Sequence, residues 1–215
     1  MSNKVSVIIP NYNSIKFIKD TLDSVFNQTY PNIEVIAIDD GSTDGSYEYL
    51  QSINRSNFIL KKNKGKGACA ARNYGFELSR GDYIMYLDAD DLINTNKIEA
   101  QMKLFEELGD EIVVSGLWSR FYESIDNLIW SKQLINKDYQ KPVDWLVDSW
   151  MGNGMGQTSI WLTPRKLIEK AGPWDEHLVI NQDGEFFNRV LLQAKAIKFC
   201  KEAKIYYRSG MSGSI

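Results

Sequence analysis

Three carboxylates stand close together in Asp88-Ala89-Asp90-Asp91, directly after the apolar run Tyr83–Leu87. The apolar run predicts a buried strand, so these charges fall at the end of that strand. Two carboxylates roughly 5 Å apart repel by about 3 kcal/mol at an effective dielectric constant of about 20. Mg²⁺ or Mn²⁺ is the natural counter-ion, because both prefer oxygen ligands and commonly share them with a bound phosphate. The pattern therefore predicts a metal site that also receives a phosphate-bearing ligand.

Apolar runs of strand length alternate with amphipathic segments of helix length through the first half of the chain. This alternation predicts an α/β fold, with helices flanking both faces of a mostly parallel central sheet. With 215 residues and 43% hydrophobic content, one domain is expected. Beyond Leu117 the pattern becomes irregular, and no firm domain boundary is visible. The predicted strands are Val5–Pro10, Ile33–Ile38, Phe58–Lys61, Tyr83–Leu87 and Glu111–Gly116, and the predicted helices are Ile15–Asn27, Asp44–Ile53, Gly67–Ser79 and Asn96–Leu108.

Polar clusters follow four of the predicted strands. They are Pro10–Asn13, Asp39–Ser42, Lys61–Gly67 and Asp88–Asp91. Each cluster alone also fits an ordinary turn or a solvated loop. In open α/β sheets, however, ligands bind beyond the carboxyl ends of the strands. We therefore expect the four clusters to line one cleft.

Charge and cysteine usage exclude several classes of protein. The net charge is only −3 and no long basic stretch occurs, so nucleic acid is not an expected partner. Cys69 and Cys200 lie far apart and outside any C-x-x-C spacing, which argues against a zinc site or a disulfide scaffold and favours the cytoplasm. No signal peptide or membrane-spanning run is encoded. Peripheral association with the inner face of a membrane stays compatible with this pattern.

Two short motifs suggest other enzyme classes. Gly65–Ala70 fits a relaxed dinucleotide-binding pattern, but no glycine follows the first predicted strand, where that fold requires one. The pair Asp88 and Asp90 resembles that of aspartyl phosphatases, in which the first carboxylate is a nucleophile. Those enzymes carry the pair after their first strand, whereas here it follows the fourth. Both interpretations are therefore weaker than the metal and phosphate site.

Five ordered motifs resemble those of the inverting nucleotide-sugar glycosyltransferases of family 2. They are Val5–Asn13, Glu34–Asp44, Ala71–Gly75, Gly81–Asp91 and Gly172–Glu176, and they cover most of residues 5–190. The resemblance implies a single Rossmann-like domain of the A-type (GT-A) fold, a nucleotide diphosphate sugar donor and Mg²⁺ or Mn²⁺. It also implies that about residues 1–116 bind the donor and about residues 117–215 bind the acceptor.

The same resemblance implies donor-binding roles by position. Asp40 bonds to the nucleobase and Arg72 to the phosphates or ribose, whereas Asp88 holds the ribose or sugar and Asp90 the metal ion. The other donor-binding candidates are Pro10, Asn11, Asn13 and Asp39. Metal and guanidinium stabilise the charge on the departing diphosphate, so no general acid is required. The chemistry then needs only one base, which deprotonates the acceptor hydroxyl.

Asp183 is the candidate base. It lies in Asn181–Arg189, which resembles the acidic segment that opens a helix beneath the acceptor site of the family, although Gln182 stands where an acidic residue is frequent. Glu185 is a weaker candidate for the same role. The competing interpretation is that both carboxylates only complement the helix dipole, as acidic residues in first turns commonly do.

The second half carries all six tryptophans, between Trp118 and Trp174, and a glycine-rich loop at Gly152–Gly156. Tryptophans most often pack in a core, although their rings can also stack on sugars or lie at a membrane interface. Trp174, in the fifth motif, and Arg208, in a segment at Tyr206–Ser212 that resembles a lid over the diphosphate, are further site candidates. Because a lid needs an anchor on both sides, we expect the natural protein to continue beyond Ile215.

The sequence therefore predicts an inverting, metal-dependent glycosyltransferase. It would move a hexose-type sugar from a nucleotide diphosphate sugar to a hydroxyl of a glycan or lipid-linked oligosaccharide, as in polysaccharide biosynthesis. A nucleotide-sugar-binding module without turnover is the second hypothesis, and a nucleotidyltransferase is the third. The nucleobase, the sugar, the linkage and the oligomeric state are not encoded in any recognisable motif.

Overall fold

The computed structural model describes residues 3–126, 128–130 and 133–210. Its main sheet has five strands in the order β3-β2-β1-β4-β7. The first four are parallel, and β7 pairs antiparallel with β4. Within the described ranges, none of the helices combines the length and apolar character needed to cross a bilayer. The strands of this sheet are β1 (Val5–Asn11), β2 (Ile33–Asp39), β3 (Phe58–Lys62), β4 (Tyr83–Tyr86) and β7 (Thr163–Pro164).

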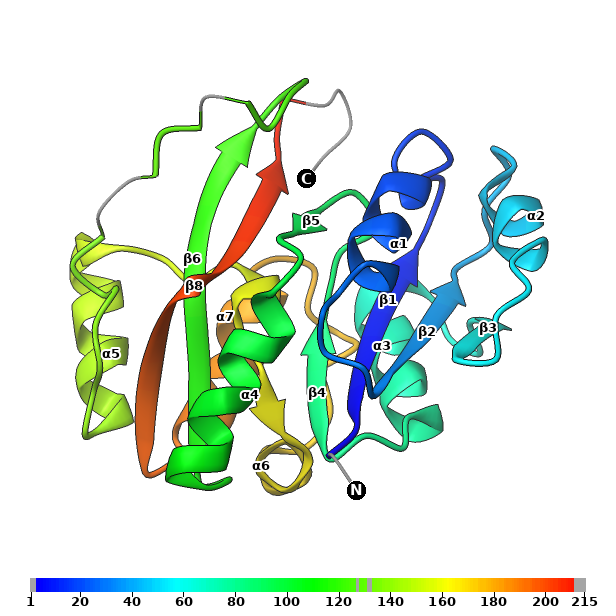
Figure 1. Ribbon diagram of the computed structural model, residues 1–215. Coiled ribbons are helices and arrows are strands. Elements are labelled where there is room, and N and C mark those ends of the chain that lie inside the picture. Colours follow the sequence, from blue (N-terminus) through cyan, green and yellow to red (C-terminus); the bar gives the residue numbers. More distant parts are fainter. Residues whose placement is uncertain (1–2, 127, 131–132, 211–215) are drawn as a thin grey trace.

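A second, three-stranded sheet lies beside the first, in the order β5-β8-β6 (Figure 1). It consists of β5 (Leu92–Ile93), β8 (Ala196–Arg208) and β6 (Ile112–Phe121), with β6 and β8 parallel and β5 antiparallel to β8. Val114 and Leu162 exchange two backbone hydrogen bonds, which link β6 to the segment that enters β7. The last strand of the chain is thereby placed next to the loop that follows β4.

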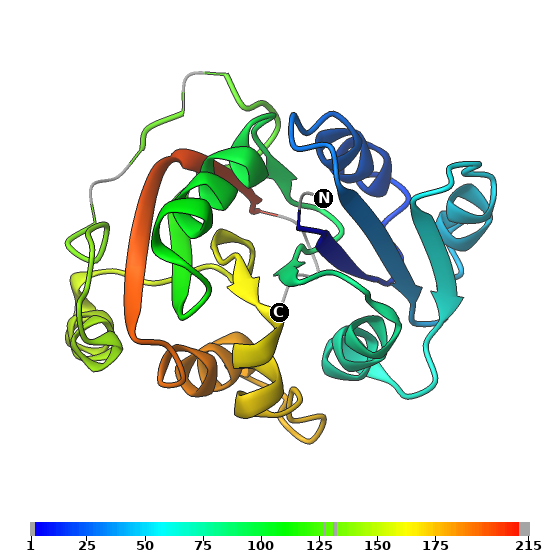
Figure 2. The same ribbon diagram turned by 60° about the horizontal axis from the view of Figure 1, so that its bottom comes forward.

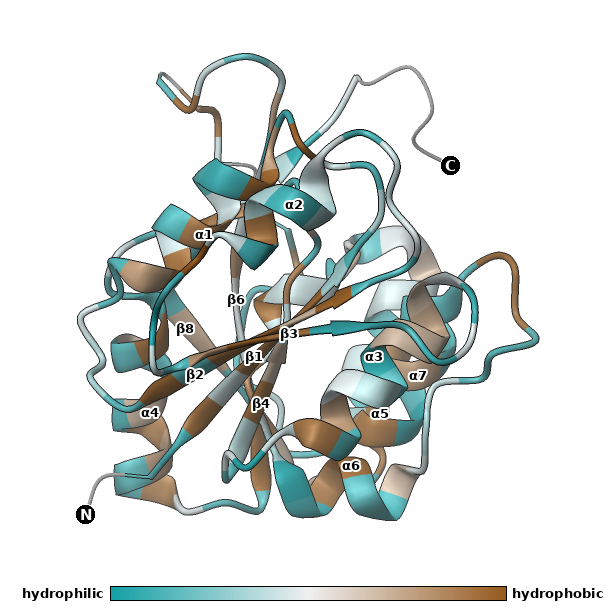
Figure 3. Cartoon of the chain, turned by 90° about the vertical axis from the view of Figure 1, so that its right-hand side faces the viewer, coloured by the Kyte–Doolittle hydropathy of each residue, from teal (hydrophilic) through white to brown (hydrophobic). Residues whose placement is uncertain are grey.

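Helices cover both faces of the main sheet. Figure 3 shows α1 and α4 on one side of the strands and α3, α6 and α7 on the opposite side, and Figure 2 shows the same layers from a tilted view. A one-turn π-helix, η1 (Ser149–Asn153), and a 3₁₀ turn, η2 (Thr158–Ile160), follow α5. The α-helices are α1 (Ile18–Phe26), α2 (Ser46–Gln51), α3 (Gly67–Leu78), α4 (Lys97–Leu108), α5 (Pro142–Asp148), α6 (Arg165–Ala171) and α7 (Gln182–Leu191).

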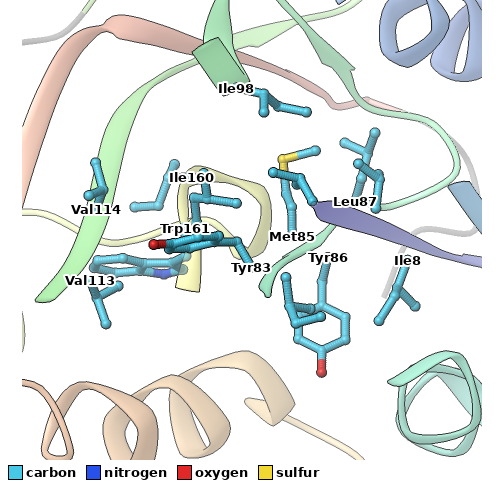
Figure 4. Close-up of a cluster of buried hydrophobic side chains, with 14 of the residues drawn as sticks. Ile8, Tyr83, Met85, Tyr86, Leu87, Ile98, Val113, Val114, Ile160 and Trp161 are labelled. Atoms are coloured by element: carbon cyan, nitrogen blue, oxygen red, sulfur yellow. The ribbon is translucent and has the colours of Figure 1, made fainter. Parts of the chain in front are cut away.

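The central strands are buried on both faces, as expected for a parallel sheet between helix layers. Met85 and Tyr86 of β4 point to opposite sides of the strand, and Trp161 lies beside Val113 of β6 (Figure 4). Helix α3 approaches β1 closely, because a Cβ on Gly75 would lie 2.4 Å from Ile8 Cγ2. The position of α3, which carries Arg72, therefore depends on that glycine.

The predicted α/β class and the mostly parallel sheet are confirmed, but several predicted boundaries are wrong. The first helix begins at Ile18 and not at Ile15. The residues before it form a turn, because the Ser14 carbonyl accepts hydrogen bonds from the N–H groups of Phe17 and Ile18. The second begins at Ser46, after Gly45 with φ 95°. Strand β6 continues to Phe121 where an irregular chain was expected, because β8 pairs with it. The sequence pattern predicted neither β8 nor the second sheet.

Candidate active site

One cavity of about 580 Å³ opens at the carboxyl ends of β1, β2 and β4. Its lining includes seven of the predicted donor and metal residues, namely Pro10, Asn11, Asn13, Asp40, Arg72, Asp88 and Asp90. They come from the loops after three strands and from α3, so three of the four expected polar clusters meet in one cleft, whereas Lys61–Gly67 does not line it. We call it the donor cavity.

Asp39 does not line the donor cavity. Its side chain is only 2% exposed and accepts hydrogen bonds from the Asn11 amide at 2.7 Å, from the Ser42 hydroxyl at 2.6 Å, and from the backbone N–H groups of Gly41 and Ser42. The carboxylate thus ties the end of β1 to the loop after β2. Asp39 positions the loop, whereas Asn11 and Asp40 face the cavity.

Asp40 connects the loop after β2 to the start of α3. One carboxylate oxygen accepts from the Asn63 amide at 2.7 Å, and the other accepts from the Gly67 N–H at 2.8 Å. Gly67 is the first residue of α3, so Asp40 fixes the entry of that helix. Within the glycine-rich segment Gly65–Ala70, the Gly67 N–H thus donates to a carboxylate of the protein itself. Each Asp40 oxygen keeps a second lone pair for a ligand.

Arg72 is held between a carboxylate and an indole ring. Its Nη2 donates to Asp88 Oδ1 at 2.8 Å, and its guanidinium carbon lies 4.5 Å from the ring centre of Trp174. Trp174 is 2% exposed and stacks on Phe186 of α7 with ring centres 4.0 Å apart. Trp174 does not line the donor cavity. It supports Arg72 from behind, and the cation–π contact orients the guanidinium.

The loop after β4 separates its carboxylates. Asp90 lines the donor cavity, and burial together with the nearby Asp88 charge raises its pKa to about 6. Asp91 is fully buried and accepts from Gln157 Nε2 at 2.6 Å and from the Arg208 N–H at 3.0 Å. Burial, then Asp88 and Asp90, raise the pKa of Asp91 well above its ordinary range. Asp91 does not line the donor cavity and instead anchors the loop from within.

Arg208 lies against this loop at the end of β8. Its Nε donates to the Asp90 carbonyl at 2.9 Å, and its guanidinium lies 4.8 Å and 4.4 Å from the ring centres of Phe17 and Phe121. Phe17 lines the donor cavity, so Arg208 is close to the cavity without lining it. Met211 and Ser212, the last two residues of the predicted lid, lie outside the described residues.

Asp88 and Asp90 fit a cation that arrives with a phosphate. Among the described residues, no three His, Cys, Asp or Glu side chains are grouped to hold a metal ion. The two carboxylates that follow β4, Asp88 and Asp90, nevertheless face the donor cavity, and Arg72 engages Asp88 through Oδ1. Mg²⁺ usually binds proteins through one or two carboxylates while phosphate and water complete its coordination. The two carboxylates therefore suit a metal ion that is also coordinated by phosphate and water better than one enclosed by protein ligands alone.

Asp183 lies at a second cavity, of about 280 Å³, beside the first turn of α7. No hydrogen bond or ion pair engages its carboxylate within the described part of the chain. Glu185, in contrast, pairs with Arg189 through two bonds of 2.5 Å and 2.8 Å, and Arg189 also donates to the carbonyls of Ala171 and Pro173. Glu185 is thus occupied by a structural ion pair, whereas Asp183 is available to a ligand.

Two sets of contacts join the cavities. Gln157, bonded to Asp91 below the donor cavity, follows Gly156, which lines the second cavity. Trp174, beneath Arg72, also makes an edge contact with Phe187 at 5.8 Å, and Phe187 lines the second cavity. The walls of the two cavities are therefore connected through Gln157 and through Trp174.

Sequence reasoning missed Gln157 and Asn73. The Asn73 side chain donates to the Trp174 carbonyl at 2.9 Å and accepts from the Trp174 N–H at 2.8 Å, which fixes the tryptophan beneath Arg72. Asn73 follows Arg72 in one of the recognised motifs, so its position was a usable signal. Gln157 has no comparable signal, because its partner is 66 residues away.

Comparison with known proteins agrees with this geometry. The family described as "Glycosyl transferase family 2" matches residues 6–170. The chain is 30% identical to the glycosyltransferase GlyG of Streptococcus pneumoniae, over 100% of this chain and 73% of GlyG. It is 28% identical to the minor teichoic acid biosynthesis protein GgaB of Bacillus subtilis, over 97% of this chain and 23% of GgaB.

Solved structures agree on the fold. Residues 1–349 of S. aureus TarS in complex with UDP-GlcNAc superpose with a TM-score of 0.80 at 20% identity, over 97% of this chain and 59% of that one. The chain thus spans less than two thirds of TarS and about a quarter of GgaB. Enzymes of the matched family typically use a divalent metal ion. The chain belongs to glycosyltransferase family 2 and is a glycosyltransferase with the GT-A fold.

Proposed function

We propose that this enzyme transfers a sugar from a nucleoside diphosphate sugar to a hydroxyl of a glycan, with inversion at the anomeric carbon. The observation that carries the proposal is the donor cavity, which brings Asn11, Asp40, Arg72, Asp88 and Asp90 from four chain segments to one set of strand ends. TarS has been solved with UDP and with UDP-GlcNAc, which supports a uridine diphosphate sugar as the first donor to test.

Each side chain has a role in this proposal. Asp40 bonds to the nucleobase, and Arg72 bonds to the diphosphate while Trp174 keeps its guanidinium in place. Asp88 and Asp90 would hold a divalent cation, which would neutralise charge on the diphosphate. Because Arg72 already forms an ion pair with Asp88, the donor enters a site whose charges are held in place before it binds.

The reaction is a single displacement. The acceptor oxygen bonds to the anomeric carbon, its proton passes to the Asp183 carboxylate, and the bond from the anomeric carbon to the β-phosphate oxygen breaks. The electron pair of that bond leaves with the nucleoside diphosphate. One displacement inverts the anomeric carbon, and no covalent sugar intermediate forms. The ion pair of Glu185 with Arg189 supports Asp183 as the base.

Thermal unfolding with a panel of nucleoside diphosphates tests the donor site. A ligand at 100 times its dissociation constant stabilises the folded state by about 2.7 kcal/mol, so the preferred base is identified by the largest rise in Tm. We expect this rise with Mn²⁺ or Mg²⁺ and its loss in EDTA. Undiminished nucleotide binding in EDTA would refute the metal requirement, and no rise with any nucleotide would refute the donor site.

A further inference from the structure

The second cavity has an aromatic wall and a polar end. Its lining includes three tryptophans together with Phe187, Asn181 and Asp183. None of the described residues that line it is lysine, arginine or histidine. At about 280 Å³ it lies just below the usual range for ligand pockets, about 300 to 1,000 Å³. The cavity thus accommodates a single ring better than a chain of units.

The buried part of the aromatic wall is rigid. Trp145 and Trp161 meet edge to face with ring centres 5.1 Å apart, and Trp161 lies over Phe187 at 5.6 Å. A Cβ on Gly156 would lie 3.1 Å from Trp161 and 3.2 Å from Trp145, so the backbone there lies directly against both indoles. The wall is therefore preformed, and a ligand does not have to order it.

Trp150 differs from the other two tryptophans, because 75% of its surface is exposed. It lies in η1, the π-helical turn Ser149–Asn153, in which Gly152 adopts a φ of 81°. Most large apolar side chains of this size are buried, and a tryptophan left in water at the rim of a cavity offers a flat apolar face to a ligand. The neighbouring Met151 is equally exposed, at 74%, but does not line the cavity.

The polar end is formed by Asn181 and Asp183. Asn181 adopts a left-handed backbone conformation, with φ 56°, just before α7. Its side chain lies over Gly184, where a Cβ would be 2.2 Å from Asn181 Oδ1. The glycine therefore allows the amide to fold back over the first turn, beside Asp183. No hydrogen bond of the Asn181 amide or of the Asp183 carboxylate is formed within the described part of the chain.

We propose that this cavity receives one pyranose ring of an uncharged glycan acceptor, stacked on Trp150, with a hydroxyl directed at Asp183. The assignment rests on the proposed function, and it adds the acceptor class. A pyranose has an apolar face formed by its C–H groups and an edge of hydroxyls, which matches the apolar wall and polar end. A lipid tail would leave the Asn181 and Asp183 groups without partners.

The charge of the cavity excludes a second class of acceptor. A polyol phosphate brings a negative charge at each repeat, and the described lining offers a carboxylate and no cation to it. Like charges in a partly enclosed site repel strongly. GgaB is named for teichoic acid biosynthesis, yet the chemistry of this cavity favours a neutral sugar.

Saturation-transfer NMR on the whole chain tests this assignment without turnover. The probes are the methyl pyranosides of glucose, galactose and N-acetylglucosamine, with ribitol 5-phosphate as the charged comparison. We expect at least one pyranoside to bind, ribitol 5-phosphate not to bind, and Trp150→Ala to weaken the pyranoside by about fivefold or more. Trp150→Phe should restore most of the binding, and Met151→Ala, with equal exposure outside the cavity, should leave it unchanged.

The same samples separate this assignment from the proposed function. Thermal unfolding measures nucleoside diphosphate binding in the presence of Mn²⁺. The rise in Tm should be equal in Trp150→Ala and in the unaltered chain. If the nucleotide binds but no pyranoside does, or if Trp150→Ala and Met151→Ala behave alike, the acceptor assignment is overturned and the donor site stands. Preferential binding of ribitol 5-phosphate would also overturn it. Pyranoside binding without any nucleotide binding would instead overturn the proposed function.

Discussion

The donor cavity is lined by loops that leave neighbouring strands of one sheet, whereas the cavity at Asp183 is lined by segments that come from α5 to α7. The first contains Asp40, Arg72, Asp88 and Asp90 together with two asparagines, and several of these side chains are held by hydrogen bonds, as in the contacts of Arg72 with Asp88 and of Asp40 with Gly67. Aromatic rings dominate the second, and its carboxylate has no bonded partner in the described part of the chain. The first cavity is thus arranged before a ligand binds, and the second offers groups that await one.

This difference separates the two demands of the reaction. A diphosphate carries several negative charges and needs fixed partners, because free charges would reorganise at a cost during the transfer. A neutral sugar acceptor needs a shaped apolar surface and one base. Substitutions in each cavity should therefore affect different kinetic constants.

The largest effect is expected from Asp183→Asn, which keeps the shape of the side chain but removes the proton acceptor. Turnover should fall by about 10² to 10⁴, the usual contribution of a general base. Donor affinity should stay nearly constant, because Asp183 lies outside the donor cavity. Steady-state kinetics with a donor titration measure both quantities.

Glu185→Gln is the matched control for that experiment. It should cost stability through the lost pairing with Arg189 while turnover per folded molecule is largely retained. If Glu185→Gln is the crippling change and Asp183→Asn is mild, the base is misassigned by two positions. If neither substitution matters, the single-base mechanism fails.

Asp90→Asn should affect the donor cavity alone. Removing one of the two carboxylates proposed to hold the metal ion should weaken metal-dependent binding of a nucleoside diphosphate by more than about tenfold. Calorimetric titration with and without Mn²⁺ measures this. Pyranoside binding at the second cavity should persist, and its loss would show that the two cavities are not independent.

Gly75→Ala should test how tightly α3 packs against β1. A methyl group there would lie 2.4 Å from Ile8 Cγ2, and overpacking of this kind costs about 1 to 3 kcal/mol. The Tm should fall by about 2 to 12 °C. Glu77→Ala, at an exposed position of the same helix, should shift the Tm little. An unchanged Tm in Gly75→Ala would show that α3 can move away from β1 without cost.

Lys97→Met should produce the smallest change, at the junction of the two sheets. Lys97 is fully buried between Met85 of β4 and Gln101, and burial lowers its pKa to about 7. Between that value and the usual pKa of about 10.4 the unfolded chain binds a proton that the folded chain does not, so folding stability gains with rising pH. Across this range the free energy of unfolding rises by at most about 1.4 kcal/mol per pH unit. Below about pH 7 both states bind the proton, so the dependence on pH disappears.

Urea unfolding at pH 7.5 and 8.5 measures that contribution. The stability of the unaltered chain relative to Lys97→Met should increase between the two values, because methionine does not titrate. Equal differences at both pH values would mean that Lys97 keeps its proton in the folded state.

Much of the first half of the chain was predictable because its signals are local. Each strand of the main sheet up to β4 is a short apolar run, and parallel strands bring the polar residues that follow them to one edge. Pro10, Asn11, Asp40 and Asp88 were placed in the cleft by that rule and by motif resemblance, and they line the donor cavity. Asp39 was not distinguishable from Asp40 in sequence, because only the fold shows which of two adjacent carboxylates points inward.

The second half of the chain depended on tertiary structure. The second sheet forms because β8 pairs with β6 and β5, at separations of about 84 to 114 residues that leave no periodic signal. The same strand brings Arg208 to Asp90, and the bond of Gln157 to Asp91 turns that carboxylate inward. The amino-acid sequence by itself thus determined the chemistry and the parallel sheet, since both follow from neighbours along the chain. Only the tertiary structure decided which carboxylates face a ligand and which tryptophan stays exposed, since burial depends on segments that meet after folding.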